Sequence, residues 1–236
     1  MLSPFWTQPS LGSFLRGQKD ARLYHNLFRC PPEEITGVRR LWHRSFSKVS
    51  LFRGIEDYLQ PLKGQQQFLL QRLRGMTRPI WLDRVQAASV GSIGVHIRRG
   101  DLSHIPTVAP LPWFIQTLKK IRQSARSEVP AFVVSDGRPE ELREFLQLPG
   151  VQYVFTGSAI SDLLLLSQAR VLLASGGSTF SAWAAFLGQM PAAAPPKHPL
   201  DYYGSVYGEG AGREFYPERP DPVFLQAALG VLSEPI

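Results

Sequence analysis

From Val90 onward, short apolar segments alternate with longer helix-like segments, and this alternation constrains the fold more than any other feature of the chain. The expected strands are Ile93–Ile97, Ala131–Ser135, Val151–Phe155, Val171–Ala174 and Pro191–Ala194. The expected helices between them are Leu111–Ala125, Pro139–Leu146, Ala159–Gln168 and Ser178–Leu187. Repeated strand–helix units predict an α/β fold, in which helices cover a Rossmann-like parallel sheet. Ligands of such folds bind at the carboxyl ends of the strands.

The first 89 residues have a different character, because they are rich in Arg, Gln and aromatic residues. Their apolar spacing predicts helices over Glu33–Phe46 and Ile55–Leu73. No segment here has the pattern of a parallel-sheet nucleus. We therefore expect a reduced, mostly helical N-terminal region over residues 1–89 and an α/β domain over residues 90–236.

The net charge of +7 favours anionic partners, such as phosphorylated small molecules, nucleic acid or an acidic membrane face. The basic residues are scattered, and no zinc-finger spacing or aromatic platform motif is present, so nucleic-acid binding is disfavoured. The single cysteine, Cys30, excludes an intrachain disulfide and a cysteine-built metal site.

The sequence contains no apolar run near the roughly 20 residues that cross a bilayer. Its first residues lack the basic-then-apolar order of a secretory signal. We therefore expect a soluble, cytoplasmic protein, whose positive charge is compatible with peripheral contact at the inner face of the membrane.

Charged residues directly follow the first expected strand, in the stretch VGSIGVHIRRGD over residues 90–101. Arginine offers a planar fork for phosphate oxygens, but side chains alternate along a strand, so Arg98 and Arg99 are not expected to reach the same phosphate. Asp101 can hold a guanidinium or accept hydrogen bonds from a base or ribose. A salt-bridged Arg–Asp pair with a turn at Gly100 explains the same residues without a ligand. The adhesive tripeptide reading of residues 99–101 is rejected, because these residues belong to a strand end.

A second polar segment follows the fourth expected strand, in VLLASGGSTFSAW over residues 171–183. Ser175 and two glycines precede Ser178 and Thr179, which open a helix. Glycines let a ligand approach the backbone, and the N–H groups of a helix start attract anions. The alternative is that Ser178 or Thr179 serves only as the helix N-cap.

A third polar segment is VVSDG over residues 133–137, where Asp136 follows the second expected strand. An Asp-Gly turn is the simpler explanation of this segment taken alone. The three strand ends together predict a nucleotide site. Arginine would bind the diphosphate, Asp would bind the base or ribose, and Ser, Thr and backbone N–H groups would bind phosphate.

Three motifs resemble those of a known enzyme family. GVHIRRGD resembles the His-x-Arg-Arg-x-Asp signature shared by α1,2-, α1,6- and protein O-fucosyltransferases. The segment SDLLLLSQARVLLASGGSTFSAWAAFLG is similar to a later signature of the α1,2 branch, and FVVSDG matches a strand-Ser-Asp element between them. The order and spacing of the motifs agree from about Val90 to Pro196.

This resemblance implies an inverting transfer of fucose from GDP-fucose to a glycan hydroxyl on a two-domain GT-B scaffold, without a metal ion or other cofactor. Arg98 would hold the diphosphate, and His96 would contact the ribose or guanine side. Asp136 would bind guanine or ribose. Ser175, Ser178 and Thr179 with their backbone would bind phosphate oxygens. Arg99 and Asp101 would shape the loop and orient Arg98.

The N-terminal Gly-rich loop of this family is not found, and the segment GSFLRGQKD resembles it only weakly. Two alternatives therefore stay open: transfer from another GDP-sugar, and a catalytically silent nucleotide-sugar binder. The catalytic base is expected on the acceptor side, where no neighbour distinguishes the candidates Glu33, Glu34, Glu56 and Asp57. The acceptor itself is not identified.

Overall fold

The computed structural model describes residues 27–29, 62–88, 92–99, 109–197 and 213–234. Its centre is a parallel sheet with the strand order β3-β2-β1-β4-β5-β6. The strands are β1 (Ile93–Ile97), β2 (Ala131–Ser135), β3 (Val151–Tyr153), β4 (Val171–Leu173), β5 (Ala192–Ala194) and β6 (Arg213–Glu214). This is the strand order of dinucleotide-binding Rossmann folds, so the expected α/β class and Rossmann-like parallel sheet are confirmed.

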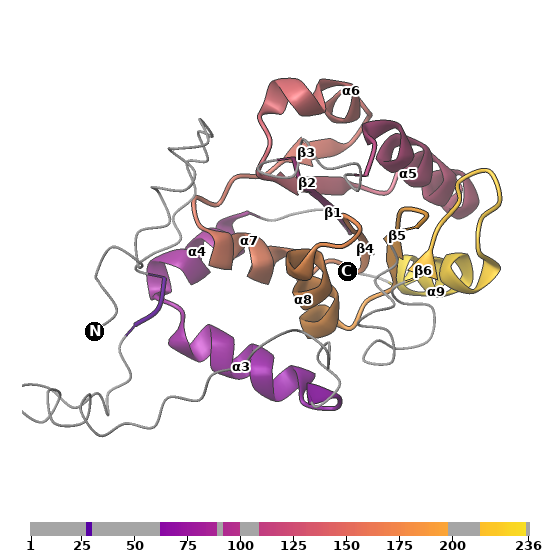
Figure 1. Ribbon diagram of the computed structural model, residues 1–236. Helices are drawn as coiled ribbons and strands as arrows, with labels where there is room; N and C mark the ends of the chain where they lie inside the picture. The colour runs from indigo at the N-terminus through magenta and orange to yellow at the C-terminus, as the bar shows by residue number, and fades with distance from the viewer. Residues whose placement is uncertain (1–26, 30–61, 89–91, 100–108, 198–212, 235–236) are drawn as a thin grey trace, which may run out of the picture.

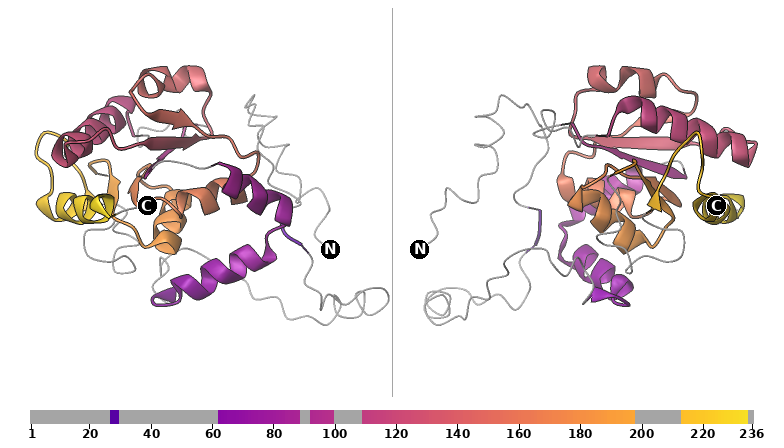
Figure 2. Two further views of the ribbon diagram at one scale, coloured as in Figure 1. Left: turned by 180° about the vertical axis from the view of Figure 1, so that it is seen from behind. Right: turned by 45° about the vertical axis from the view of Figure 1, so that its right-hand side comes forward.

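Helices cover both faces of the sheet (Figures 1 and 2). One face carries α5 (Leu111–Ala125), the 3-10 turn η3 (Pro139–Leu142), α6 (Arg143–Leu146) and α9 (Pro222–Ser233). The other face carries α7 (Ala159–Leu166) and α8 (Thr179–Gly188). Beyond them lie α3 (Gln66–Met76), which contacts α8, and α4 (Pro79–Ala87), which contacts α7.

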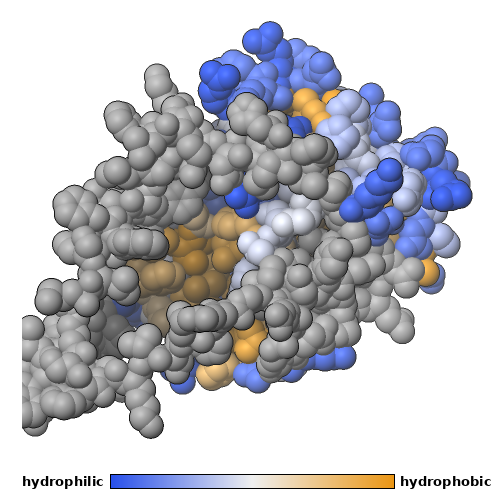
Figure 3. Space-filling model, viewed as in Figure 1, coloured by the Kyte–Doolittle hydropathy of each residue, from blue (hydrophilic) through white to orange (hydrophobic). Residues whose placement is uncertain are grey.

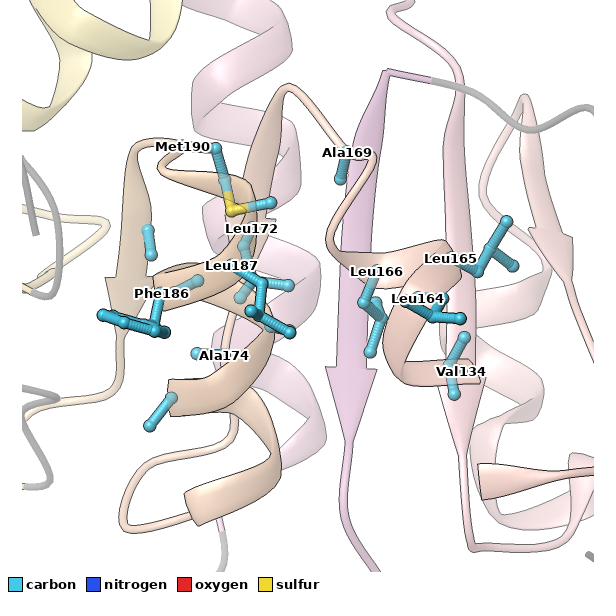
Figure 4. Close-up of a cluster of buried hydrophobic side chains, with 14 of the residues drawn as sticks. Val134, Leu164, Leu165, Leu166, Ala169, Leu172, Ala174, Phe186, Leu187 and Met190 are labelled. Atoms are coloured by element: carbon cyan, nitrogen blue, oxygen red, sulfur yellow. The ribbon is translucent and has the colours of Figure 1, made fainter. Parts of the chain in front are cut away.

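The alternation of side chains along β1 separates two hydrophobic cores. Ile93, Val95 and Ile97 are fully buried in the core under α5, α6 and α9. The opposite core contains Leu164 to Leu166 of α7 together with apolar residues of α8 and the sheet, and Figure 4 shows this cluster. Apolar residues also gather in a hollow on the face shown in Figure 3, over the area where α4 and α7 lie in Figure 1.

The predicted elements agree closely with the structure at the centre of the sheet. The bounds of β1, β2 and α5 are those expected, while β3, β4 and β5 are shorter than expected. The helix expected over Pro139–Leu146 is divided into η3 and α6. The sequence analysis did not predict β6 or α9, although Asp221 caps α9 and Pro222 begins it.

In the N-terminal region the structure corrects one helix and leaves another untested. The helix expected over Ile55–Leu73 has different bounds, because α3 begins at Gln66, after a turn in which Gly64 has a positive φ of 81°. Residues 55–61 and the helix expected over Glu33–Phe46 lie outside the described residues. The division into domains at residue 89 stays a prediction. Within the described ranges, no helix is long and apolar enough to cross a membrane.

Gly94 in β1 packs directly against Leu166 of α7 and Ala169, which follows that helix. A Cβ at this position would lie 2.8 Å from the Cβ of Ala169 and 3.1 Å from the Cζ of Phe132. Real Cβ atoms do not approach a methyl group so closely, and Ala169 cannot rotate away. Glycine at position 94 is therefore required by packing.

We predict that Gly94→Ala lowers the free energy of unfolding by about 1–3 kcal/mol, because overpacking displaces the neighbouring backbone. Gly75→Ala is the matched control, since Gly75 lies in α3, and among the described residues nothing beyond its chain neighbours and its own helix backbone comes within 4 Å of an added Cβ. The control should leave stability unchanged or raise it by up to about 1 kcal/mol. Urea denaturation of both variants tests this, and equal stabilities would contradict the packing argument.

Candidate functional site

The polar segments predicted from the sequence meet at the point where the strand order reverses. The chain leaves β1 toward β2 on one side, whereas β4 lies on the other side of β1. In open α/β sheets this arrangement opens a crevice beyond the carboxyl ends of the two central strands. The segment beginning at His96 ends β1, and the segment beginning at Ser175 follows β4. Residues about 80 positions apart in the sequence thus form one rim.

Ser175 joins these two strand ends through its side chain. Its Oγ accepts a hydrogen bond from the backbone N–H of Arg98 at 2.9 Å and donates to the carbonyl of His96 at 2.9 Å. The residue is only 4% exposed. Because the β1–β4 ladder ends at the pair Val95 and Leu173, this hydroxyl continues the connection between the two strands to the rim.

His96 is held from two sides and is only 5% exposed. Its Nδ1 lies 2.7 Å from the Oγ of Ser181 in α8, and its ring packs against Phe180 with centroids 4.9 Å apart. The Ser181 Oγ also accepts a hydrogen bond from the backbone N–H of Ser175 at 3.2 Å. The imidazole therefore has a fixed orientation between β1 and the first turn of α8.

Arg98 follows β1 and is partly exposed at the rim. By the alternation of side chains, it belongs to the same side of β1 as His96, which is the side covered by α8. The N-terminus of α8 lies on this side, and its first residue, Thr179, is exposed. A guanidinium and a helix N-terminus together favour an anionic ligand.

Ser178 is the N-cap of α8, since its buried hydroxyl accepts a hydrogen bond from the N–H of Ser181 at 3.4 Å. The capping role that the sequence left as an alternative is thus present. A contact between the Ser178 side chain and phosphate stays a prediction, as do the ligand contacts of Ser175 and Thr179.

Arg99 and Asp136 join the ends of β1 and β2. The Asp136 carboxylate accepts a hydrogen bond from the backbone N–H of Arg99 at 2.6 Å, and the Arg99 guanidinium donates to the carbonyl of Ala109 at 2.8 Å. Arg99 thereby joins the end of β1 to Asp136 and Ala109, and its predicted role in shaping the loop and orienting Arg98 stays a prediction. Asp101 lies outside the described residues, so its predicted role is not tested.

Burial lowers the pKa of the Arg99 guanidinium below its usual value, although the carboxylates of Glu141 and Asp136 act in the opposite direction. An arginine keeps its charge at any working pH despite such a shift. One Asp136 oxygen is already used to hold Arg99 in place, and its predicted contact with guanine or ribose stays a prediction.

The sequence analysis did not select Asp162 as a site residue, yet this carboxylate is fully buried beneath the loop that follows β3. It accepts hydrogen bonds from the hydroxyl of Thr156 at 2.6 Å and from the backbone N–H of Thr156 at 3.4 Å. The Arg84 side chain of α4 donates to the Thr156 carbonyl at 2.8 Å. One acidic residue within the apolar helix segment SDLLLLS was the available signal, because buried carboxylates need partners.

The described residues thus form a rim that can bind an anion and orient a polar ligand. Among them, no group of three or more His, Cys, Asp or Glu side chains is placed to share a metal ion. The candidates for a catalytic base in the N-terminal region all lie outside the described residues: Glu33, Glu34, Glu56 and Asp57.

We predict that Ser175→Ala lowers the free energy of unfolding by about 1–3 kcal/mol, because it removes the hydrogen bonds of the Ser175 hydroxyl with the Arg98 N–H and the His96 carbonyl. Ser167→Ala is the control, because the buried Ser167 hydroxyl donates to the carbonyl of Leu164, in the helix that Ser167 follows, at 2.8 Å. Its loss should cost less than about 1 kcal/mol. Chemical denaturation measures both values, and a cost for Ser175 no greater than for Ser167 would contradict the bridging role.

Comparison with known proteins places these features in a family. The model of glycosyl transferase family 11 matches residues 57–192. Galactoside alpha-(1,2)-fucosyltransferase 2 of Sus scrofa is 35% identical over 106 residues, which cover 40% of this chain and 30% of that protein. Galactoside alpha-(1,2)-fucosyltransferase 1 of Saimiri boliviensis boliviensis is 32% identical over 138 residues, covering 53% and 35%. The chain thus spans about a third of the length of these relatives.

A crystal structure of POFUT1 in complex with GDP also matches, with a TM-score of 0.36 and 18% identity over 50% of this chain and 46% of that one. This structural likeness is too weak to support an argument. The family match is stronger evidence, since it covers more than half of the 236 residues and runs from before α3 through α8. The chain belongs to glycosyl transferase family 11.

Proposed function

We propose that this protein binds GDP-fucose at the β1–β4 rim and transfers fucose to a hydroxyl group of a galactoside. Membership of glycosyl transferase family 11 supports a sugar transfer, and relatives named galactoside alpha-(1,2)-fucosyltransferases support this donor and acceptor class. The observation that carries the proposal is the hydrogen bond from the Arg98 backbone N–H to Ser175, which ties the segment after β1 to the segment that leads into the N-terminus of α8 at the reversal point of the sheet.

In this proposal, Arg98 binds the diphosphate of the donor through its planar guanidinium. Charge-assisted hydrogen bonds of this kind are stronger than neutral ones. The N-terminus of α8 adds backbone N–H donors beside it, and His96 contacts the nucleoside side of the donor. Asp136 and Arg99 keep the neighbouring strand ends in place through the hydrogen bond between them.

The proposed reaction inverts the configuration at the anomeric carbon. The acceptor oxygen attacks this carbon from the side opposite to GDP, and the bond to the diphosphate breaks with its electron pair leaving on GDP. A base takes the proton of the acceptor hydroxyl as the new bond forms. Negative charge grows on the departing diphosphate, so the Arg98 cation stabilises the transition state more than the ground state. We propose that this neutralisation takes place without a metal ion.

We predict that Arg98→Lys lowers the transfer rate by about 10²–10³-fold and weakens GDP binding, because lysine keeps the charge but loses the two-pronged contact. Arg170→Lys is the control, since Arg170 lies at the start of β4, at the opposite end of the strands. Its guanidinium contacts the carbonyl of Glu234 at 2.7 Å and the Glu234 carboxylate at 3.7 Å. This control should keep activity and lose no more than about 0.5 kcal/mol of stability.

Calorimetry with GDP and a transfer assay with GDP-fucose and a panel of galactosides test the proposal. A folded Arg98→Lys variant that binds GDP and turns over like the parent would contradict the proposal that Arg98 binds the diphosphate. Turnover with a different GDP-sugar in place of GDP-fucose would show that fucose is not the sugar that this protein transfers. GDP binding without turnover on any acceptor would identify a nucleotide-sugar binder in place of an enzyme.

A further inference from the structure

The hydrogen bonds of Ser181 carry an inference about His96 that does not depend on any ligand being present. Ser181 is fully buried in the first turn of α8. A serine hydroxyl has one proton to donate and two lone pairs that accept. One lone pair of Ser181 accepts the backbone N–H of Ser175 at 3.2 Å. The other contact of this oxygen is the Nδ1 of His96 at 2.7 Å.

The destination of the Ser181 proton follows from these contacts. A buried donor is almost always paired, since an unpaired one loses its hydration without compensation. Within the part of the chain that the structure describes, the Nδ1 of His96 is the one acceptor in reach of this proton. The hydroxyl of Ser178 contacts the backbone N–H of Ser181 and makes no hydrogen bond with the Ser181 hydroxyl.

We propose that Ser181 is a positioning residue that donates to the Nδ1 of His96 and thereby holds the imidazole in the tautomer protonated at Nε2. In a neutral imidazole, one nitrogen donates and the other accepts, so an acceptor at Nδ1 requires a donor at Nε2. If Nδ1 carried the proton instead, the buried Ser181 hydroxyl would have to give up its acceptor. The contact with Phe180 fixes the plane of the same ring.

The consequence for ligand recognition rests on the proposed function. A fixed Nε2–H is a hydrogen-bond donor, so His96 would recognise an acceptor atom of the nucleotide, such as a ribose oxygen or a base carbonyl. The arrangement also links this histidine to the rim, because Ser181 and Ser175 are joined and Ser175 bonds to both His96 and Arg98. The hydroxyl of Ser181 in α8 would thus determine that the Nε2 of His96, and not its Nδ1, donates to the ligand.

The tautomer is tested by nitrogen NMR on the full chain labelled with 15N-histidine, in spectra recorded at rising pH until the imidazole signals no longer change. The chain has five histidines, and His96→Gln assigns the His96 signals by their disappearance. We expect a protonated Nε2 and an unprotonated Nδ1 shifted by its hydrogen bond. A protonated Nδ1 in the parent protein would overturn the proposal without any further variant.

Ser181→Ala should move the Nδ1 signal to the position of a nitrogen without a hydrogen bond. It should also weaken GDP binding by about threefold to tenfold, as expected for one hydrogen bond. Ser161→Ala is the matched control, because Ser161 is the third residue of α7, as Ser181 is of α8, and donates to the Trp81 carbonyl at 3.1 Å. The control should leave the His96 signals unchanged, and an unchanged Nδ1 signal in a folded Ser181→Ala variant would contradict the proposal.

Substitutions of His96 itself test which imidazole nitrogen donates to the bound nucleotide. Gln places its amide N–H near the position of Nε2, whereas Asn places its amide near Nδ1. His96→Gln should therefore keep more GDP affinity than His96→Asn, and the reverse order would contradict a donor at Nε2. Failure of the parent protein to bind GDP would contradict the proposed function, whereas the NMR test would still decide the tautomer of His96.

Discussion

The bridge that Ser175 makes between β1 and β4 is the interaction on which the rim depends. In an open α/β sheet the crevice forms where the connections that follow two neighbouring strands turn to opposite faces of the sheet, as they do after β1 and β4. Without a further connection, the two ends would be free to move apart. The Ser175 hydroxyl bonds to both sides of the His96–Arg98 segment while its backbone N–H bonds to Ser181. The crevice therefore opens beyond two strand ends that Ser175 holds together.

The two arginines after β1 illustrate how adjacent residues of one type acquire different tasks. Arg99 is held by Asp136 through its backbone and by Ala109 through its side chain, so it stabilises the rim. Arg98 has its backbone fixed by Ser175, and the alternation of side chains, continued one residue beyond β1, assigns its side chain to the face that α8 covers. The difference arises from strand geometry, because neighbouring side chains leave a strand on opposite sides. This separation was predictable from the sequence.

The periodicity of the sequence was sufficient to predict β1, β2 and α5 to the residue, because each is a continuous pattern of one period. It was sufficient to place the segments around Arg98, Asp136 and Ser175 at strand ends. It could not provide the strand order, which depends on tertiary packing. The contact between His96 and Ser181 was equally hidden, since these residues are 85 positions apart and a serine after a helix start resembles an ordinary capping motif.

The same capping arrangement occurs twice in this fold and has two different outcomes. In both α7 and α8, a serine N-cap precedes a serine at the third helical position. In α7 the second hydroxyl donates to the carbonyl of Trp81, so it fastens this helix to α4. In α8 the second hydroxyl meets an imidazole, because His96 comes from the strand below it. A local motif thus stabilises two helices alike, while the residue opposite its second serine, Trp81 of α4 or His96 of β1, decides whether that serine holds a helix or an imidazole in place.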